Sequence, residues 1–156
     1  EYRACRATAI VAGVPADVAR RELAQAAFHL SELSAELRVL PQREGPGNAL
    51  LIEVEHVAVS EVFTGFGARG VAAEKVADQV AGSARHYLES GAAVGEHLAD
   101  QLVLPMALAG GGRLLTGRPS SHLLTNLALI EKFLPLLTRI REVGTNWLVD
   151  IVSRPG

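Results

Sequence analysis

The stretch from Tyr2 to His29 is YRACRATAIVAGVPADVARRELAQAAFH, and it predicts a strand followed by a helix. Apolar and β-branched residues continue up to Gly13, which favours a strand over the first part. Pro15 stands where helices often begin, and apolar residues at helical spacing follow it from Ala16 to His29. A strand that leads through a proline into a helix indicates the start of an α+β unit.

The residues after this helix predict further strands and a second helix. Pro41 and the run Gly45–Asn48 interrupt regular structure, and Gly65–Gly70 is expected to be a loop. The expected order is therefore β-α-β-β-β-α, which makes a compact two-layer α+β unit. The predicted elements are strands over Leu33–Leu40, Ala49–Val54 and Val57–Phe63 and a helix over Val71–Leu88.

The segment after Gly91 predicts a separate α-β-α-β-β unit. Its helices are apolar over much of their circumference, which is typical of helices buried on more than one side. A unit of this size buries little surface by itself, so we expect it to pack against a part that this chain does not contain. Pro105 is expected to kink the first helix or to end it early. The predicted elements are helices over Val94–Ala109 and from Pro119 to about Leu134, with strands over Arg113–Gly117, Leu136–Arg141 and Asn146–Val152.

Composition restricts the class of protein. Of the 156 residues, 49% are hydrophobic and 21% are charged, and the formal net charge is −2. These values exclude intrinsic disorder and a polybasic coat for nucleic acid. No apolar run reaches the about 18 to 20 residues that span a bilayer, and no signal peptide is evident, so we expect a cytoplasmic chain without membrane partners. Its single cysteine, Cys5, excludes an internal disulfide and a multi-cysteine zinc site.

The glycine motifs do not indicate a familiar nucleotide fold. The run Gly65–Gly70, GFGARG, matches the dinucleotide pattern G-x-G-x-x-G between a strand and a helix. A dinucleotide site also needs a parallel βαβ unit with an acidic residue at the end of the second strand, and the order of elements here does not supply it. These glycines are better explained by a turn. The sequence contains neither a P-loop nor a G-x-S-x-G elbow.

His122 is the histidine whose place suggests chemistry. His29, His56 and His86 are expected at the surface, and no pair of histidines has metal-ligand spacing. His122 lies in the first turn of a predicted helix, where unpaired N–H groups and the positive end of the dipole favour a bound anion. A neutral imidazole there could attack phosphorus. The alternative is an ordinary histidine at a helix start.

A small polar group opens the preceding helix. Glu96, Asp100 and Gln101 stand at the start of an otherwise apolar segment. Carboxylates in this place could bind Mg²⁺ or ribose hydroxyls. The alternative is that acidic residues are simply favourable in a first helical turn.

Several blocks, in order along essentially the whole chain, resemble the RNA 3′-terminal phosphate cyclase family. The two most specific are Gly95–Gln101, GEHLADQ, and His122–Asn126, HLLTN. The resemblance implies that residues 1–91 form the small inserted domain of that family, which has a thioredoxin-like β-α-β-β-β-α arrangement. It implies that residues 92–156 form the last unit of a repeated large domain whose first two units are missing. The full set of matching blocks is Val11–Pro15, Gly45–Asn48, Phe63–Gly67 with Gly70–Val71, Ala92–Leu102, Leu104–Gly111 and Ser121–Asn126.

The resemblance also implies an activity with ATP and Mg²⁺. In this family a histidine takes AMP from ATP, AMP passes to the 3′-terminal phosphate of RNA, and the neighbouring 2′-hydroxyl closes a 2′,3′-cyclic phosphate. His122 matches the histidine that carries AMP. Asp100 is the best candidate to hold ribose hydroxyls or the metal. The segment that matches the adenosine side of the pocket comprises Glu96, His97, Leu98, Ala99, Asp100 and Gln101.

Two residues depart from the family pattern. His97 stands where bacterial members commonly carry a tyrosine that stacks on adenine, and Ser121 stands where a cysteine is common. An imidazole still offers a π-face, so adenine binding should persist. The family's other phosphate and RNA contacts lie in the missing N-terminal half, so we expect the isolated chain not to turn over RNA. A cyclase-like branch that binds in ribosome assembly without catalysis is the alternative, although it lacks the histidine present here as His122.

Overall fold

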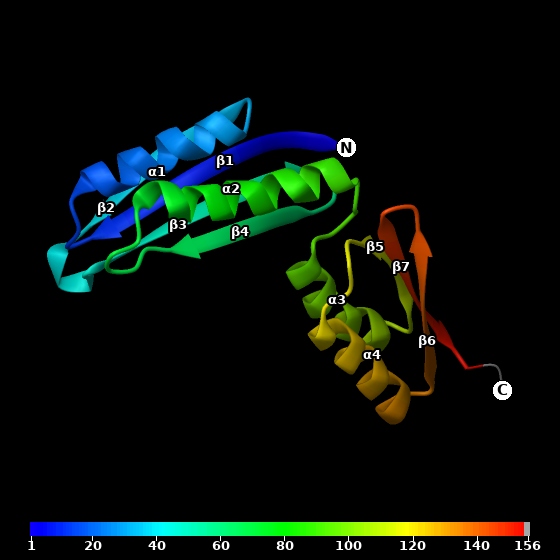
Figure 1. Cartoon of the computed structure of the whole chain (residues 1–156). Coiled ribbons are helices and arrows are strands. Elements are labelled where there is room, and N and C mark those ends of the chain that lie inside the picture. The colour runs from blue at the N-terminus through cyan, green and yellow to red at the C-terminus, as the bar shows by residue number, and fades with distance from the viewer. Residues whose placement is uncertain (155–156) are drawn as a thin grey trace. The chain divides into compact units, whose positions relative to one another are not determined.

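The computed structural model describes residues 1–154, which divide into two compact units (Figure 1). The first unit covers Glu1 to His86, and the second begins at Tyr87. The division falls within the helix α2 (Ala73–Ser90). Each unit combines helices with one sheet, so the α+β class predicted from the sequence is confirmed.

The first unit contains a four-stranded sheet in the order β2-β1-β3-β4. β1 is parallel to β2 and antiparallel to β3, and β4 is antiparallel to β3. The chain order is β-α-β-β-β-α, the thioredoxin-like arrangement that the resemblance implies. The strands are β1 (Tyr2–Ala12), β2 (Leu33–Leu40), β3 (Gly47–His56) and β4 (Ser60–Phe66), with a short 3-10 turn at Gln42–Glu44.

The helices α1 (Ala16–His29) and α2 lie over the same face of this sheet (Figure 1). Alternate residues of the strands point toward them, because side chains in a strand alternate between its two faces. Small side chains dominate this layer, which lets the helices approach the sheet closely. The buried residues that alternate along the central strands are Cys5, Ala7, Ala9, Val11, Leu50, Ile52 and Val54, and Ala12 at the end of β1 is also buried.

The end of the first unit's sheet differs from the prediction in one respect. Gly65 and Phe66 belong to β4 and not to a loop, and the third predicted strand begins at Ser60. A Cβ at Gly65 would lie 2.4 Å from the Val80 Cγ2 of α2. The glycine therefore lies within β4 and leaves room for α2 to pack against the strand. The residues before Ser60 form the turn, where the His56 N–H donates to the Val59 carbonyl.

The second unit contains a three-stranded antiparallel sheet in the order β5-β7-β6. Its helices α3 and α4 pack against each other, and each also contacts the sheet. The core joins α3 and α4 to the sheet and includes Ala99, Val103, Leu123, Leu127, Val149 and Ile151. The elements are α3 (Glu96–Leu108), β5 (Gly112–Thr116), α4 (Ser121–Phe133), β6 (Leu136–Val143) and β7 (Asn146–Ser153).

Pro105 lies inside α3 without ending it. The helix continues to Leu108, and the Ala109 N–H donates to the Pro105 carbonyl. Proline removes the bond to the carbonyl of Gln101, but both residues are exposed, so water can hydrate that carbonyl. No helix among residues 1–154 combines the length and apolar character needed to cross a bilayer.

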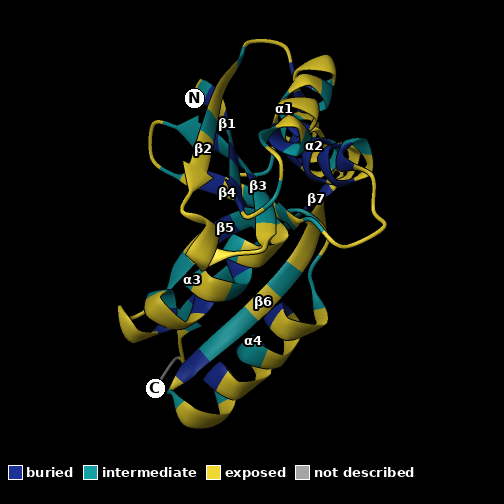
Figure 2. Cartoon of the chain, turned by 90° about the vertical axis from the view of Figure 1, so that its left-hand side faces the viewer, coloured by how far each residue is buried: buried dark blue, intermediate teal, exposed yellow. Residues whose placement is uncertain are grey.

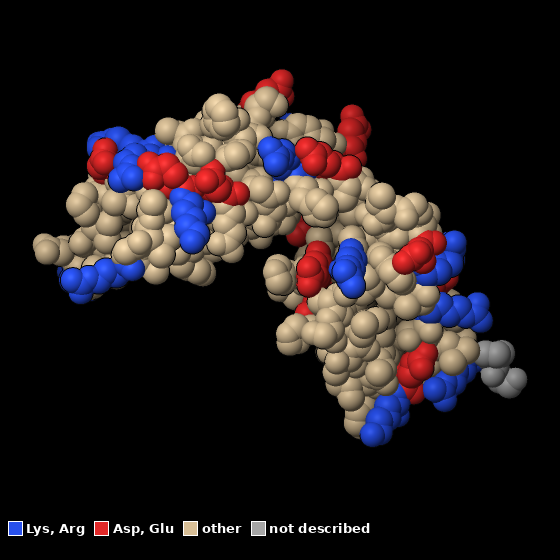
Figure 3. Space-filling view, in the orientation of Figure 1, with Lys and Arg blue, Asp and Glu red and all other residues tan. Residues whose placement is uncertain are grey.

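Exposed residues run along α3 and α4 (Figure 2), and several of them are large and apolar. Phe133 is 75% exposed and Leu108 is 71% exposed. In the space-filling view, uncharged atoms predominate over these two helices (Figure 3). The helices are thus apolar on a second side, as the sequence predicts, and in this chain that side faces solvent. The exposed large side chains there are Leu104, Leu108, Leu129 and Phe133, whereas Leu124 is exposed on another side of α4.

Candidate active site

His122 lies in the first turn of α4, as the sequence predicts. Ser120 is the N-cap of the helix, and its Oγ accepts a hydrogen bond of 2.9 Å from the Leu123 N–H. The preceding N–H groups, those of Ser121 and His122, belong to the end of the helix that has no intrahelical acceptors. His122 is exposed. An accessible imidazole therefore sits at a helix end that favours a bound anion.

A hydrogen bond joins the two sequence blocks that are most specific to the family resemblance. The Asn126 Nδ2 donates to the Asp100 Oδ1 over 2.9 Å and approaches the Asp100 carbonyl at 3.4 Å. Asn126 follows His122 by one helical turn, so both lie on the same side of α4. The Asp100 carboxyl is therefore held beside the side of α4 that carries His122.

Sequence reasoning gave Asn126 no role of its own. The available signal was its spacing of four residues from His122, which puts an amide on the same helix side as the histidine. Only the packing of α3 on α4 shows that the partner of this amide is Asp100.

The six residues predicted to line the adenosine side do not share one environment. Glu96, His97 and Gln101 are exposed, whereas Leu98 and Asp100 are half-buried. Ala99 is fully buried, so it packs within the unit and presents no surface to a ligand. His97 and Gln101 are four residues apart on one side of α3, where they can act together.

The polar residues continue into apolar stripes on the same helix sides. On α3, Leu104 and Leu108 extend the side that carries His97 and Gln101. On α4, Leu129 and Phe133 similarly extend the side of His122 and Asn126. The exposed apolar side chains of each helix are thus continuous with its candidate site residues.

The carboxyl groups at the start of α3 fit a magnesium ion that takes only part of its shell from the protein. Among residues 1–154, no group of three or more histidine, cysteine or acidic side chains could enclose a metal. Magnesium commonly takes one or two carboxylates, with phosphate and water oxygens completing its shell. Asp100 offers one carboxyl, oriented by the amide of Asn126, and Glu96 precedes it by one turn of α3. One or two carboxylates suit an ion whose remaining ligands come from water or from a bound phosphate.

A depression elsewhere in the second unit contains none of the predicted site residues. It is open to solvent and lies at the edge of β5, where the Arg113 Nη2 donates to the Asp150 Oδ2 over 2.9 Å. Its lining comprises Gly110, Gly111, Gly112, Arg113, Asp150, Ile151, Val152 and Ser153.

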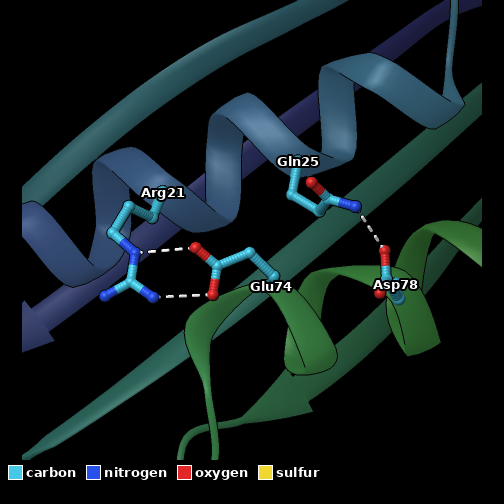
Figure 4. A network of polar contacts seen from close by, with 4 residues as sticks. All are labelled: Arg21, Gln25, Glu74 and Asp78. Atoms are coloured by element: carbon cyan, nitrogen blue, oxygen red, sulfur yellow. Dashed lines mark hydrogen bonds and ion pairs between the residues drawn. The ribbon is translucent and has the colours of Figure 1, made fainter.

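Hydrogen bonds and ion pairs in the first unit link α1 to α2 (Figure 4). Two nitrogens of Arg21 donate to the two carboxylate oxygens of Glu74, each over 2.7 Å. The Asp78 Oδ1 contacts both the Gln25 Nε2 and the His29 Nε2 at 2.7 Å. These bonds lower the pKa of the Glu74 and Asp78 carboxyls. The network therefore holds the two helices together.

The histidines of the first unit differ in exposure, and Glu22 and Cys5 are buried there. His86 is exposed as predicted, whereas His29 and His56 are half-buried. Glu22, which the sequence did not single out, is fully buried, and its Oε1 accepts a 2.5 Å hydrogen bond from the Asn48 Nδ2. Burial raises the pKa of Glu22 and that of the Cys5 thiol. A buried thiol of raised pKa is chemically inert at neutral pH.

The comparisons with known proteins agree on one family. Residues 1–89 match the family model described as the insert domain of RNA 3′-terminal phosphate cyclase (RTC). The chain is 57% identical over 127 residues to a protein named RNA 3′-terminal phosphate cyclase from Ralstonia nicotianae, covering 81% of this chain and 37% of that protein. It is 47% identical over 142 residues to the protein of the same name from Salmonella agona, covering 91% and 41% respectively.

These matches extend beyond the inserted domain into the second unit, since 142 aligned residues exceed the 89 of the family model. The chain spans about two fifths of the length of the curated relatives it matches. On the family model and the relatives together, the chain belongs to the RNA 3′-terminal phosphate cyclase family.

Proposed function

We propose that this chain is a C-terminal portion of an enzyme that converts an RNA 3′-terminal phosphate to a 2′,3′-cyclic phosphate at the expense of ATP. In this proposal residues 1–91 are the inserted domain and residues 92–156 are the last unit of the catalytic domain. One observation carries it: accessible His122 opens α4 on the side where Asn126 holds Asp100. The names and identities of the relatives support the same reaction.

The first step is a nucleophilic attack by His122. A neutral ring nitrogen attacks the α-phosphorus of ATP, the bond from that phosphorus to the bridging oxygen breaks, and pyrophosphate leaves with the electron pair. The N–P bond leaves AMP on the histidine. The N-terminus of α4 favours negative charge, so it would stabilise the phosphate while the attack proceeds.

Two further transfers complete the reaction. An oxygen of the RNA 3′-phosphate attacks the phosphorus on His122, the N–P bond breaks, and an RNA–adenylate anhydride forms. The neighbouring 2′-hydroxyl then attacks the RNA phosphorus and loses its proton, and AMP leaves as the cyclic phosphate closes. The 2′-hydroxyl makes the reaction specific to RNA, because DNA lacks that group.

The start of α3 would hold the nucleotide. The exposed ring of His97 offers a π-face to adenine in place of a tyrosine, with Glu96, Leu98 and Gln101 around it. Ala99 contributes by fixing the helix from within the core. Asp100 would hold ribose hydroxyls or Mg²⁺, and the ion would neutralise phosphate charge during transfer.

The remainder of the large domain would cover the apolar side of α3 and α4. These exposed stripes are continuous with the site residues, and the relatives are much longer than this chain. We therefore expect the isolated chain not to turn over RNA. RNA with a 3′-terminal phosphate and the N-terminal half of the enzyme are its proposed partners.

The test is labelling with ATP that carries its label on the α-phosphate, in the presence of Mg²⁺. The chain is assayed alone and with the N-terminal portion of the Ralstonia nicotianae relative. We expect acid-labile, alkali-stable label that is lost in His122→Ala. His86→Ala, which changes another exposed histidine, should retain it.

The two arms separate the outcomes. Label that needs the N-terminal portion would support a site split between the two halves. Label on neither arm would contradict the proposed chemistry and favour a non-catalytic binding role. Repeated RNA turnover by the chain alone would contradict its incompleteness.

A further inference from the structure

β2 is an edge strand with an open outer side. It pairs with β1 over eight consecutive residue pairs, from Cys5 with Leu33 to Ala12 with Leu40. Among residues 1–154 no strand pairs with its other side. Most of its residues are exposed (Figure 2), and Val39 is 64% exposed. A row of backbone donors and acceptors therefore faces solvent along a strand longer than the average.

β2 lacks three of the features that usually prevent edge-to-edge pairing, namely a bulge, a lysine and a proline. Its register with β1 has no bulge, and it contains neither lysine nor proline, since Pro41 follows its last residue. The charged side chains are Glu36 and Arg38, which point to the same side of the strand. The Arg38 Nε donates to the Glu36 Oε1 over 2.6 Å, so opposite charges stand side by side.

We propose that β2 pairs with the β2 of a second copy of this chain, antiparallel about a two-fold axis at Leu37. In that register, Glu36 of each copy lies opposite Arg38 of the other. The four charges form a checkerboard in which every carboxylate has a guanidinium beside it and another across from it. The charges of β2 are thus complementary to those of a second β2 related to it by the two-fold axis.

The opposite side of the strand fits the same register. There Leu37 meets Leu37 of the second copy, and Ala35 meets Val39. Ala35 and Val39 are exposed in the single chain, so pairing removes apolar surface from water. The two four-stranded sheets would join into one continuous sheet of two copies.

A two-fold register at the middle of β6, an edge strand of the second unit, lacks this complementarity. A two-fold axis at its Ile140 would place Arg139 opposite Arg141. Like charges directly opposite each other are unfavourable. A two-fold register at the middle of the strand is therefore favourable for β2 and unfavourable for β6.

Charge exchange in β2 tests both the pairing and its register. Sedimentation velocity is run on the wild-type chain up to hundreds of micromolar, where we expect a reversible dimer. Glu36→Arg places arginines opposite one another, and Arg38→Glu places glutamates opposite one another. Each variant alone should dimerise at least about tenfold more weakly. Lys75→Glu, an exposed charge change on α2, serves as the control and should dimerise normally.

Two combinations should restore the dimer. The double variant Glu36→Arg/Arg38→Glu regains opposite charges in the homodimer. A mixture of the two single variants should form a heterodimer that neither forms alone. Far-UV circular dichroism and thermal unfolding show that each variant folds. A monomeric wild type, single variants that dimerise normally, or combinations that fail to restore pairing would each overturn the proposal.

Discussion

The two helix pairs of this chain differ in the chemistry of their outer surfaces: one is charged and the other is apolar. Over α1 and α2, acidic and basic side chains mingle, and Arg21, Gln25 and His29 bind carboxylates of the neighbouring helix (Figures 3 and 4). Over α3 and α4, large apolar side chains are exposed and the polar link is Asp100 with Asn126. The outer surface of the first pair is polar and suited to contact with water. The second has an apolar surface suited to contact with further protein, and its candidate catalytic residues are on that surface.

The largest expected effect is in the core beneath α4. Leu123 is fully buried, so Leu123→Ala should destabilise the second unit by about 2–5 kcal/mol. Trp147 is the only tryptophan in the sequence and lies on β7, so its fluorescence during urea unfolding reports this unit. Leu124→Ala is the matched control, because Leu124 is 48% exposed and its loss should change stability by less than about 0.5 kcal/mol. Equal losses in both variants would mean that the outer side is also packed.

The next largest effect is expected from the hydrogen bond between Asn126 and Asp100. Asn126→Ala removes the amide that orients Asp100, so labelling of His122 should fall about tenfold or more, as expected for a hydrogen bond to a charged group. The measurement uses the arm of the labelling experiment that contains the N-terminal portion of the relative.

Thr125→Ala is its neighbour and control, since its hydroxyl donates only to the Ser121 carbonyl of its own helix in the described contacts. Unchanged labelling in Asn126→Ala would remove Asp100 from the proposed pocket. A fall of the same size in Thr125→Ala would indicate a general disturbance of α4.

The sequence predicts the element order well and the contacts between elements poorly. Alternation and helical spacing are local, so the range Ala16–His29 and the first-turn place of His122 follow from them. The role of Gly65 depends on where Val80 arrives from α2, and the role of Asn126 depends on where α3 packs. Neither contact can be predicted from the spacing of residues along the sequence. The site residues were predicted through family resemblance. Without it, His122 could be a nucleophile or an ordinary histidine at a helix start.

Glu22 provides a pH-dependent contrast between the units. Its pKa is raised by burial in the folded chain, so the folded state binds its proton more tightly than the unfolded state does. Stability of the first unit should therefore fall as pH rises from the ordinary glutamate pKa through the raised value. Glu22→Gln should flatten that fall, measured by circular dichroism melts across this interval. Trp147 fluorescence should show no such change in the second unit, and an unaltered pH profile in Glu22→Gln would contradict the assignment.

The smallest expected effect lies in the charged surface of the first helix pair. Arg21 and Glu74 make a bidentate contact, yet their side chains are 48% and 41% exposed, so water and salt screen their attraction. Glu74→Gln should lower the unfolding midpoint of the first unit only slightly, and the difference should vanish at high salt. A double-mutant cycle with Arg21→Gln measures the coupling. A large loss that persists in salt would mean that this contact supports the α1–α2 pair as strongly as buried leucines support α3 and α4, and the contrast between the two pairs would then fail.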